Sequence, residues 1–335
     1  MHFHDNYSLK NFNSFGINVF AKKFARFSND IELAEILEHS KGQKLILGGG
    51  SNILFTKNFD GLILKNEIDG IEIIKDDEQY VYVKAGGGIG WQEFVLYCIE
   101  KNLAGAENLS LIPGSVGASP MQNIGAYGVE VKDIFYELEA YHINDKKIVC
   151  FTNKDCQFGY RESIFKNKLK GEFVITSVTF RLNKTPVFNT SYGAIETELQ
   201  KMGVQDVSIK AISDAVISLR KSKLPDPKVI GNAGSFFKNP TIKNEQFQIL
   251  KIGFPGIVGY AVGDNETKLA AGWLIEKCGF KGYRLNDAGC SEKQALVLVN
   301  YGNATGEEIL LVSEKIINAV KLMFNVTLQK EVNIV

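Results

Sequence analysis

The stretch LIPGSVGASPMQNIGAYGVEV (residues 111–131) has glycines at 114, 117, 125 and 128 and is otherwise rich in small residues. Such a run lets backbone N–H groups approach an anion or a planar ring without obstruction by side chains. A second glycine-rich stretch, GGGSN (residues 48–52), directly follows KLIL, which is expected to be a short buried strand over residues 44–47. Each loop alone is also typical of a plain turn. Together they indicate one large phosphorylated cofactor.

A third segment, LRKSKLPDPKVIGNAGSFFKNP (residues 219–240), holds Ser235 between a glycine turn and two phenylalanines. Lys223 and Asn239 lie on its flanks. The glycines and prolines fit a well-specified surface connection, which is the structural interpretation. The functional interpretation is a hydroxyl fixed beside an aromatic wall, which suits chemistry better than packing.

Helices and strands are mixed along the chain, without an internal repeat. Asn29 is expected to cap a helix over residues 31–39, and residues 71–75 and 80–86 alternate as a β-hairpin. Two further helices are predicted over residues 91–101 and 307–324. Their apolar stripes are Trp91, Phe94, Val95, Cys98 and Ile99 in the first, and Ile309, Val312, Ile316, Val320 and Met323 in the second.

Two common nucleotide-binding motifs are excluded. AGGGIG follows the strand at residues 80–86 but lacks the GxGxxG spacing and the later acidic residue of a dinucleotide fold, so it is expected to be a tight strand-to-helix turn. The dipeptide Gly-Lys never occurs, which excludes a P-loop.

Composition narrows the class of protein. The chain has 335 residues, 45% of them apolar, which predicts a globular protein of two or three domains. Its 38 basic and 38 acidic residues leave no net charge to attract nucleic acid, so an anionic substrate must meet a local cation. No signal peptide or bilayer-length apolar run is present, which predicts a cytoplasmic enzyme. An odd number of cysteines without CxxC spacing predicts reduced core thiols and no metal site: Cys98, Cys150, Cys156, Cys278 and Cys290.

These motifs also carry a family resemblance. GGGSN, residues 111–131, GYRESIFK (residues 159–166), SYGAIE (residues 191–196) and KLPDPKVIGNAGSFFKNP (residues 223–240) resemble, in order and spacing, the UDP-N-acetylenolpyruvoylglucosamine reductase family. The similarity covers essentially the whole chain, and SYGAIE resembles the longer class of these enzymes. The resemblance implies an α+β protein with a vanillyl-alcohol-oxidase-type FAD-binding fold. Its two subdomains would span residues 1–67 and 68–219, and an α+β substrate domain residues 220–335, with the last strand returning to the active site.

The resemblance implies an activity and its cofactors. NADPH would reduce UDP-N-acetylglucosamine enolpyruvate to UDP-N-acetylmuramate through FAD, in bacterial peptidoglycan precursor synthesis. The four histidines lie outside every motif, so the FAD is expected to be noncovalent. The substrate is a small sugar nucleotide, and no nucleic acid, membrane or obligate protein partner is inferred. The expected cofactor-binding residues are Gly48, Gly49, Gly50, Ser51, Asn52, Pro113, Gly114, Ser115, Gly117, Ala118, Ser119, Asn123, Gly125, Ala126 and Tyr127.

Three residues match the family's catalytic positions. Arg161 would bind the substrate carboxylate through a planar guanidinium, and its plainer role is a salt bridge. Glu331 would polarise the same carboxylate, either protonated or paired with Arg161. Lys330 precedes it where the family usually has proline. Ser235 would donate a proton to the enolate carbon. No histidine adjoins Ser235, which argues against a Ser-His-Asp hydrolase.

Five residues match substrate-binding positions. Lys223 would meet the diphosphate of the nucleotide, or it is a solvated surface lysine. Tyr192 would contact the substrate, or it is a packed aromatic. Asn239 is a third candidate for binding the nucleotide substrate. Lys281 and Gln294 are further candidates.

Two other functions fit parts of the sequence. Another FAD-dependent oxidase or dehydrogenase of this fold would keep the glycine loops without needing Arg161, Ser235 and Glu331 together. A non-catalytic flavin-binding or uridine-nucleotide-binding module would need none of the three.

Overall fold

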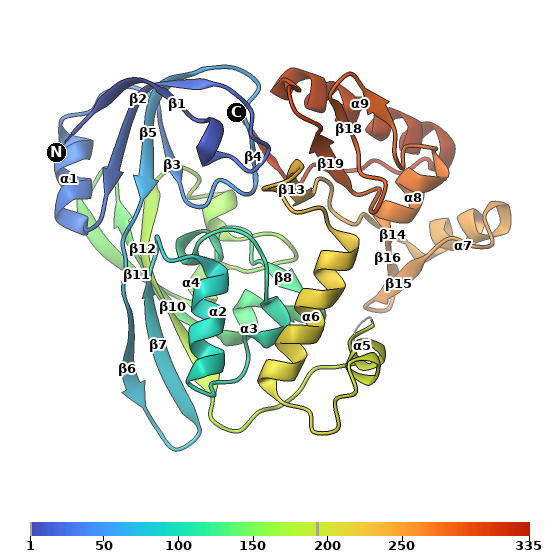
Figure 1. The fold of residues 1–335 in the computed structure, drawn as a ribbon, viewed down its shortest axis with the longest axis horizontal. Coiled ribbons are helices and arrows are strands. Elements are labelled where there is room, and N and C mark those ends of the chain that lie inside the picture. The colour runs from blue at the N-terminus through green and yellow to red at the C-terminus, as the bar shows by residue number, and fades with distance from the viewer. Residues whose placement is uncertain (1, 192–193) are drawn as a thin grey trace. The chain divides into compact units, whose positions relative to one another are not determined.

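The computed structural model describes residues 2–191 and 194–335 (Figure 1). The chain divides into two compact units, each assembled from separated segments. Unit 1 comprises Met1–Tyr7, Ala21–Gly50 and Asp60–Lys221, and unit 2 comprises Ser8–Phe20, Ser51–Phe59 and Ser222–Val335. Both units mix helices and strands, in agreement with the predicted α+β class.

Unit 1 contains a four-stranded sheet in the order β1-β2-β5-β3. Its strands are β1 (His4–Ser8), β2 (Phe20–Phe27), β5 (Phe59–Asn66) and β3 (Lys44–Leu47), and β3 runs parallel to β5. Helix α1 (Asp30–Glu38) begins where the Asn29 side chain accepts a hydrogen bond from the N–H of Glu32, 2.9 Å away. The predicted Asn29 cap and the predicted strand over residues 44–47 are confirmed.

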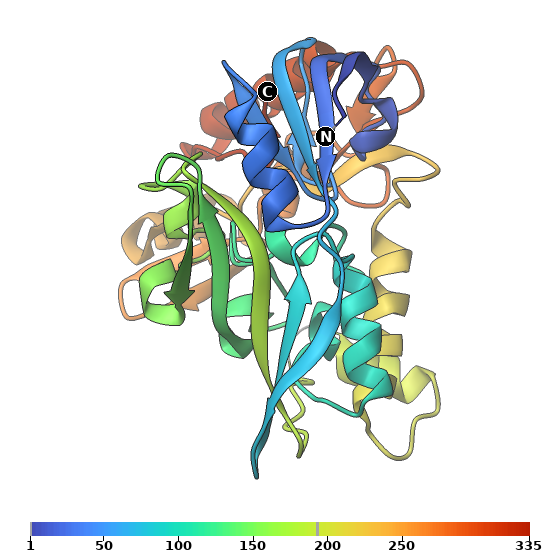
Figure 2. The ribbon, with the colours of Figure 1, turned by 90° about the vertical axis from the view of Figure 1, so that its left-hand side faces the viewer.

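A five-stranded antiparallel sheet in the order β11-β10-β12-β7-β6 forms the rest of the framework of unit 1. The strands are β6 (Ile71–Asp76), β7 (Tyr80–Gly86), β10 (Phe135–His142), β11 (Lys147–Thr152) and β12 (Phe173–Asn183). β6 and β7 form the predicted hairpin, closed where the Asp77 side chain accepts from the N–H of Tyr80 over 2.8 Å. Figure 2 shows helix α2 (Trp91–Glu100) beside this sheet. Trp91, Phe94 and Cys98 on α2 are at most 1% exposed, because they pack into its core.

Shorter elements complete unit 1. They are the strands β8 (Gly125–Ala126) and β9 (Val129–Glu130), the helices α3 (Val131–Ile134), α4 (Asn153–Cys156), α5 (Ile195–Lys201) and α6 (Ile209–Lys223), and the 3-10 turns Glu107–Leu109, Val116–Ala118 and Ile164–Lys166.

Unit 2 is built on a four-stranded sheet in the order β13-β19-β18-β17, with a three-stranded sheet in the order β14-β16-β15 and the parallel pair β20-β4. Its strands are β4 (Ile53–Leu54), β13 (Gly231–Ser235), β14 (Thr241–Lys243), β15 (Gly259–Val262), β16 (Glu266–Leu269), β17 (Arg284–Leu285), β18 (Ala288–Cys290), β19 (Val297–Asn300) and β20 (Asn333–Ile334). Its helices are α7 (Asn244–Gly253), α8 (Ala271–Lys277) and α9 (Gly306–Phe324), with a 3-10 turn over Lys10–Phe12.

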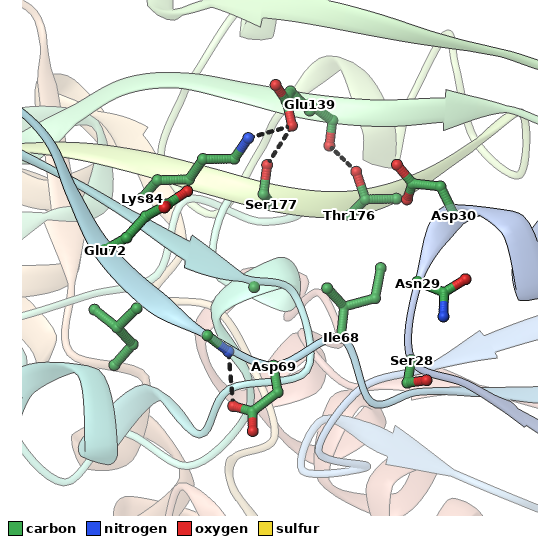
Figure 3. A pocket seen from close by; sticks show the side chains of 13 residues that line it. Ser28, Asn29, Asp30, Ile68, Asp69, Glu72, Lys84, Glu139, Thr176 and Ser177 are labelled. Atoms are coloured by element: carbon green, nitrogen blue, oxygen red, sulfur yellow. Dashed lines mark hydrogen bonds and ion pairs between the residues drawn. The ribbon is translucent and has the colours of Figure 1, made fainter.

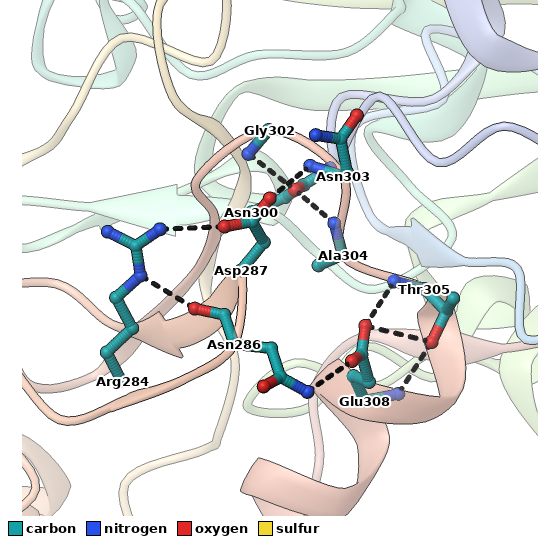
Figure 4. Close-up of polar contacts among 9 residues, drawn as sticks. All are labelled: Arg284, Asn286, Asp287, Asn300, Gly302, Asn303, Ala304, Thr305 and Glu308. Carbon is teal, nitrogen blue, oxygen red and sulfur yellow. Dashed lines mark hydrogen bonds and ion pairs between the residues drawn. The ribbon is translucent and has the colours of Figure 1, made fainter.

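Helix α9 begins at a capping box. The Thr305 hydroxyl accepts from the N–H of Glu308 over 3.1 Å, and the Glu308 carboxylate accepts from the N–H of Thr305 over 2.8 Å (Figure 4). Asn286 also donates to Glu308, which joins the start of α9 to the turn after β17.

Two predictions about individual side chains are wrong. Met323 was expected in the buried stripe of α9 but is 45% exposed, because the stripe continues from Val320 to Phe324, four residues on. Cys150 was expected in the core but is exposed, since it lies on the outer strand β11 beside Glu137. Cys278 is only half-buried, while the other three cysteines are buried and all five are free thiols.

Candidate active site

The two predicted cofactor loops meet in unit 1. A Cβ atom added to Gly49 would lie 2.8 Å from the Cα of Gly114, and one added to Gly48 would collide with the Ser115 side chain. Gly50 and Gly114 both have positive φ, 64° and 130°, a backbone conformation that glycine adopts without strain. The close approach of the two backbones therefore requires these glycines, whether or not a ligand also needs the space beside them.

The AGGGIG turn supports the same loop. As predicted, it connects a strand to a helix, since β7 ends at Gly86 and α2 starts after Gly90. The turn also bonds residues 114–117: the N–H of Gly117 donates to the Gly87 carbonyl (3.0 Å), and the N–H of Val116 to the Ile89 carbonyl (2.8 Å). The sequence did not reveal this second role, because the two segments become neighbours only in the folded unit.

Ser115 provides a test of whether these loops fit a phosphorylated cofactor. Its side chain is 4% exposed, and within the described residues its hydroxyl has no hydrogen-bond partner. Burying a hydroxyl without a hydrogen bond costs free energy, so the Ser115 hydroxyl is expected to donate to an oxygen of a bound ligand. Ser115 also precedes the 3-10 turn Val116–Ala118, within a glycine-rich backbone. This donor set fits the phosphates of a dinucleotide.

Other predicted cofactor residues are already engaged by the protein. Asn123 is fully buried, and its amide donates to the Glu130 carboxylate (3.1 Å) and the Gly159 carbonyl (3.0 Å). Its Oδ1 accepts from the N–H of Lys132 (3.0 Å). The Ser119 hydroxyl donates to the Val116 carbonyl (2.8 Å). These two side chains hold the loop in shape.

Arg161 lies against the far end of the same loop. Its Nη2 donates to the carbonyl of Gly125 over 2.6 Å, and its guanidinium lies 5.2 Å from the centre of the Tyr160 ring. The backbone of Arg161 has φ of 56°, an unusual value for arginine. Strained backbone of this kind often occurs at functional sites. Gly125 and Ala126 form β8, which turns through Tyr127 into β9.

The motif GGGSN continues beyond unit 1, because Ser51 and Asn52 belong to unit 2. The Asn52 amide donates to the Glu331 carbonyl (3.3 Å), and the Asn52 carbonyl accepts from both the backbone and the side chain of Asn333 (3.1 and 2.9 Å). Asn52, expected to bind cofactor, thus also holds the segment that carries Glu331.

Ser235 ends strand β13 at a β-bulge. The register of β13 against β19 shifts between Asn232 and Ser235, and Gly234 between them has φ of 70°. The buried Asn232 side chain accepts from the N–H of Gly234 over 2.9 Å and so fixes the bulge. A bulge re-aims the side chain that follows it. The glycine turn predicted around Ser235 is therefore an irregularity within a strand.

Glu331 lies on the segment paired with the one that follows Ser235. The N–H of Glu331 donates to the Phe236 carbonyl (2.8 Å), and the N–H of Lys238 donates to the Gln329 carbonyl (2.9 Å). Phe236 and Phe237 are at most 1% exposed, with ring centres 5.2 Å apart. Unit 2 therefore brings Ser235 and Glu331 onto neighbouring segments, and two buried phenylalanines directly follow Ser235. Arg161 belongs to unit 1.

Lys330, which precedes Glu331, forms an isolated bridge with Phe237. Its ammonium pairs with the carboxylate of Glu314 on α9. The lysine therefore links the last segment to helix α9 through an ion pair at the surface.

The predicted substrate residues occupy different environments. The Asn239 side chain accepts from the N–H of Ala271 at the start of α8 (3.0 Å). Gln294 lies beside the same turn, since its Oε1 is 2.8 Å from where a Cβ of Gly272 would be. Lys223 is exposed at the end of α6, and Lys281 is exposed and paired with Glu276 (3.0 Å). Tyr192 lies outside the described residues.

A separate cavity of about 420 Å³ lies in unit 1 (Figure 3). The Glu139 carboxylate in its wall accepts from Lys84 (2.7 Å) and Ser177 (2.9 Å). Burial and the charge of Glu139 raise the pKa of the Asp30 carboxyl nearby. The cavity contains none of the predicted site residues. Within the described residues, no group of three or more histidine, cysteine, aspartate or glutamate side chains is arranged to hold a metal ion.

Two family models match the chain. A model described as FAD binding domain matches residues 22–149. A model described as UDP-N-acetylenolpyruvoylglucosamine reductase, C-terminal domain, matches residues 226–335. The first match contains both glycine loops, and the second contains Ser235 and Glu331.

Curated relatives match over the full length. UDP-N-acetylenolpyruvoylglucosamine reductase of Flavobacterium johnsoniae is 50% identical and that of Amoebophilus asiaticus is 47% identical, each with 100% of both chains covered. The crystal structure of UDP-N-acetylenolpyruvylglucosamine reductase from Thermus caldophilus superposes with a TM-score of 0.68 at 21% identity, covering 99% of this chain and 98% of that one. This similarity and the FAD-binding model confirm the predicted fold class. None of the described helices is long and apolar enough to cross a bilayer.

Proposed function

Because the chain belongs to the UDP-N-acetylenolpyruvoylglucosamine reductase family, we propose that it reduces UDP-N-acetylglucosamine enolpyruvate to UDP-N-acetylmuramate, with NADPH as donor and FAD as cofactor. The observation that carries the proposal is the pairing of the Ser235 and Glu331 segments through the Phe236 carbonyl. This pairing brings a serine and a glutamate onto adjacent segments, which supports a role for both in reducing an enol ether beside a carboxylate.

The cofactor would be held noncovalently by unit 1. Gly48, Gly49, Gly50 and Gly114 leave room for phosphates beside the backbone, and the buried Ser115 hydroxyl lacks a protein partner. Bound FAD would supply hydride, taken from NADPH, to the methylene carbon of the substrate. The chain's own residues must then stabilise the negative charge that develops beside the carboxylate and deliver a proton.

Ser235 is the proposed proton donor. Its Oγ would donate to the carbon that bears the carboxylate. Free serine is a weak acid, but an enolate carbon is a strong base and fixed geometry promotes the transfer. The bulge before Ser235 and the burial of Phe236 and Phe237 after it support a fixed, partly dry position for the hydroxyl.

Arg161 and Glu331 are the proposed groups for the substrate carboxylate. A guanidinium binds two carboxylate oxygens at once and stabilises charge as it accumulates. Its contact with the Gly125 carbonyl fixes the direction of the Arg161 side chain. Glu331 would act protonated or paired with Arg161, because a free carboxylate would repel the developing charge.

The nucleotide would be bound by Lys223, Asn239, Lys281, Gln294 and Tyr192. The supporting observation is that Asn239 and Gln294 both reach the first turn of α8. We also propose the division into two FAD-binding subdomains, residues 1–67 and 68–219, and a substrate domain, residues 220–335. We propose that the enzyme acts in the cytoplasm on this soluble sugar nucleotide, without nucleic acid, membrane or an obligate protein partner.

The proposal is tested by anaerobic mixing of the purified protein with NADPH and then with UDP-N-acetylglucosamine enolpyruvate. The flavin absorbance is expected to bleach in the first step and to recover in the second, with UDP-N-acetylmuramate as product. Bleaching without recovery would indicate another flavin-dependent oxidoreductase. A colourless protein that takes up no FAD would rule out both.

A further inference from the structure

Asn232, on strand β13 of unit 2, precedes Ser235 by three residues and is 1% exposed. Its side chain makes three hydrogen bonds. The amide donates to the carbonyls of Pro225 (3.1 Å) and Ile230 (2.8 Å), and Oδ1 accepts from the N–H of Gly234 (2.9 Å). Both donors and the acceptor of this buried side chain are therefore used, as is usual for a polar group in a protein interior.

The ladder between β13 and β19 does not by itself determine the direction of the Ser235 side chain. Asn232 pairs with Val299, and Ser235 pairs with Val297. From one pair to the next, β13 advances by three residues and β19 by two, so the main chain leaves the regular ladder. Gly234 has a φ of 70° at this point, and its N–H is bound by the Asn232 side chain. That bond is thus a contact that defines the bulge.

The other two hydrogen bonds of Asn232 connect the bulge to the loop that follows Lys223. This loop, residues 224–230, closes on itself, since the N–H of Ile230 donates to the Asp226 carbonyl over 2.9 Å. Its two prolines restrict the main chain further. Asn232 therefore links the segment that carries Ser235 to a loop with a defined shape of its own.

We propose that Asn232 is a positioning residue for the reduction, because its side chain orients the Ser235 hydroxyl by fixing the bulge against the loop of residues 224–230. Proton transfer to carbon requires an aligned donor, and a displacement of about 1 Å can slow a reaction roughly a hundredfold. The Asn232 side chain is buried with its polar atoms bonded within the protein, so its effect reaches the substrate through Ser235. The inference rests on the proposed function, because it requires Ser235 as the proton donor.

The test compares Asn232→Leu with the unaltered enzyme, both as holoproteins. Leucine is similar in size to asparagine and removes all three hydrogen bonds. Bleaching of the flavin by NADPH, followed by stopped-flow absorbance, is expected to be unchanged, because this step does not use Ser235. Formation of UDP-N-acetylmuramate in a single turnover is expected to slow roughly a hundredfold. Deuterium oxide should slow the variant more than the unaltered enzyme, since proton transfer then limits the rate.

Asn300→Leu is the matched control. Asn300 lies on the adjacent strand β19, is 5% exposed, and also makes three side-chain hydrogen bonds. Its amide donates to the Phe15 carbonyl, and its Oδ1 accepts from the N–H groups of Gly302 and Ala304, each over 2.9 Å. None of these three bonds involves the bulge before Ser235. Both half-reactions of this variant are therefore expected to match those of the unaltered enzyme.

Two further variants distinguish orientation of Ser235 from general packing. Asn232→Ser keeps an oxygen that can accept from the N–H two residues later, as serine does in turns, so its product formation should be faster than that of Asn232→Leu. Combining Asn232→Leu with Ser235→Ala should give a rate no lower than that of Ser235→Ala alone, because Asn232 acts through Ser235.

Four outcomes would overturn the inference. They are unchanged product formation in Asn232→Leu, an equal loss in Asn300→Leu, a rate of Asn232→Ser as low as that of Asn232→Leu, and a combined variant in which the two single losses multiply. Should Asn232→Leu misfold, Asn232→Ala replaces it, with the same slowing expected and an unchanged rate contradicting the inference. An unaltered enzyme whose flavin bleaches without recovering would instead refute the proposed function.

Discussion

The N–H of Glu331 lies 2.8 Å from the carbonyl oxygen of Phe236, the residue immediately after Ser235. Two positions separated by nearly a hundred residues are thus joined by a main-chain hydrogen bond. Backbone pairing fixes their separation whatever their side chains are. Substitution of either side chain should therefore change chemistry while leaving the pairing in place.

Ser235→Ala is expected to abolish turnover and leave flavin reduction intact. General acid catalysis contributes roughly 10²–10⁴-fold, so product formation should fall by at least that amount. Stopped-flow absorbance with NADPH alone should show a normal rate of bleaching. The control is Ser40→Ala, which alters a half-buried serine just after α1. Equal loss of both half-reactions would contradict the assigned role.

Arg161→Lys should lower kcat/KM by roughly a hundredfold or more, because lysine cannot form the planar two-point contact with a carboxylate. Steady-state kinetics with the enolpyruvyl substrate measures the change. Arg181→Lys, which makes the same substitution at an exposed strand position, should leave kcat/KM unchanged. Near-normal turnover of Arg161→Lys would show that two-point binding of the carboxylate is unimportant.

Gly49→Ala is expected to weaken the binding of FAD. The new Cβ would lie 2.8 Å from the Cα of Gly114, so one of the two loops must move. Flavin absorbance remaining after gel filtration measures retention, and we expect affinity to fall by roughly tenfold or more, about 1.4 kcal/mol. Gly253→Ala is the control, since a Cβ there meets nothing within 4 Å and needs no unusual φ. Full retention by Gly49→Ala would contradict the proposed role of this contact.

Glu107 should make stability depend on pH. Its side chain is 3% exposed, and burial raises the pKa of its carboxyl above the ordinary value. The folded state therefore holds the proton more tightly than the unfolded state. Its stabilising effect is fully present below about pH 4, the unfolded pKa, and is lost as pH rises through the folded pKa.

The measurement is the thermal midpoint of the holoprotein between pH 4 and 8. Glu107→Gln has no proton to lose, so the midpoint of the unaltered protein should fall relative to this variant as the pH rises. Glu100→Gln, an exposed position at the end of α2, should show no such trend. A constant difference between Glu107→Gln and the unaltered protein would contradict the prediction.

The pairing of Lys330 with Glu314 should contribute little to stability. Their side chains are 26% and 48% exposed, and partly exposed ion pairs contribute about 0–1 kcal/mol. A double-mutant cycle with Lys330→Ala and Glu314→Ala, followed by denaturant unfolding, measures the coupling. A coupling energy well above that range would mean that the pair is essential to the last segment.

Local elements were readable from the sequence because local chemistry determines them. The Asn29 cap, the hairpin of β6 and β7 and the strand β3 each depend on residues within a few positions of one another. The end of the buried stripe on α9 could not be predicted in this way. Met323 and Phe324 are both apolar, and only the packing of the folded chain determines which of them is buried.

The sequence identified the motifs of the candidate site but not the contacts between them. Ser235, Arg161 and the glycine loops stand out in sequence because glycine, proline and aromatic residues cluster around them. Nothing nearby in sequence distinguishes Arg220, whose Nε donates to the Leu111 carbonyl, from Lys221 and Lys223, which are exposed. The approach of Gly49 to Gly114 likewise joins segments that the sequence shows only as two separate turns.

Strand β4 obtains its partner late in synthesis. It pairs with β20, and the neighbouring bond from Asn333 to Asn52 spans 281 residues. At translation rates of about 5–20 residues per second, β4 waits on the order of tens of seconds for that strand. Until then the main chain of β4 lacks its partner, although Leu54 of that strand is fully buried in the finished protein. A nascent chain stalled before β20 should therefore be a substrate for ribosome-associated chaperones, because the pairing of β4 with β20 is then missing.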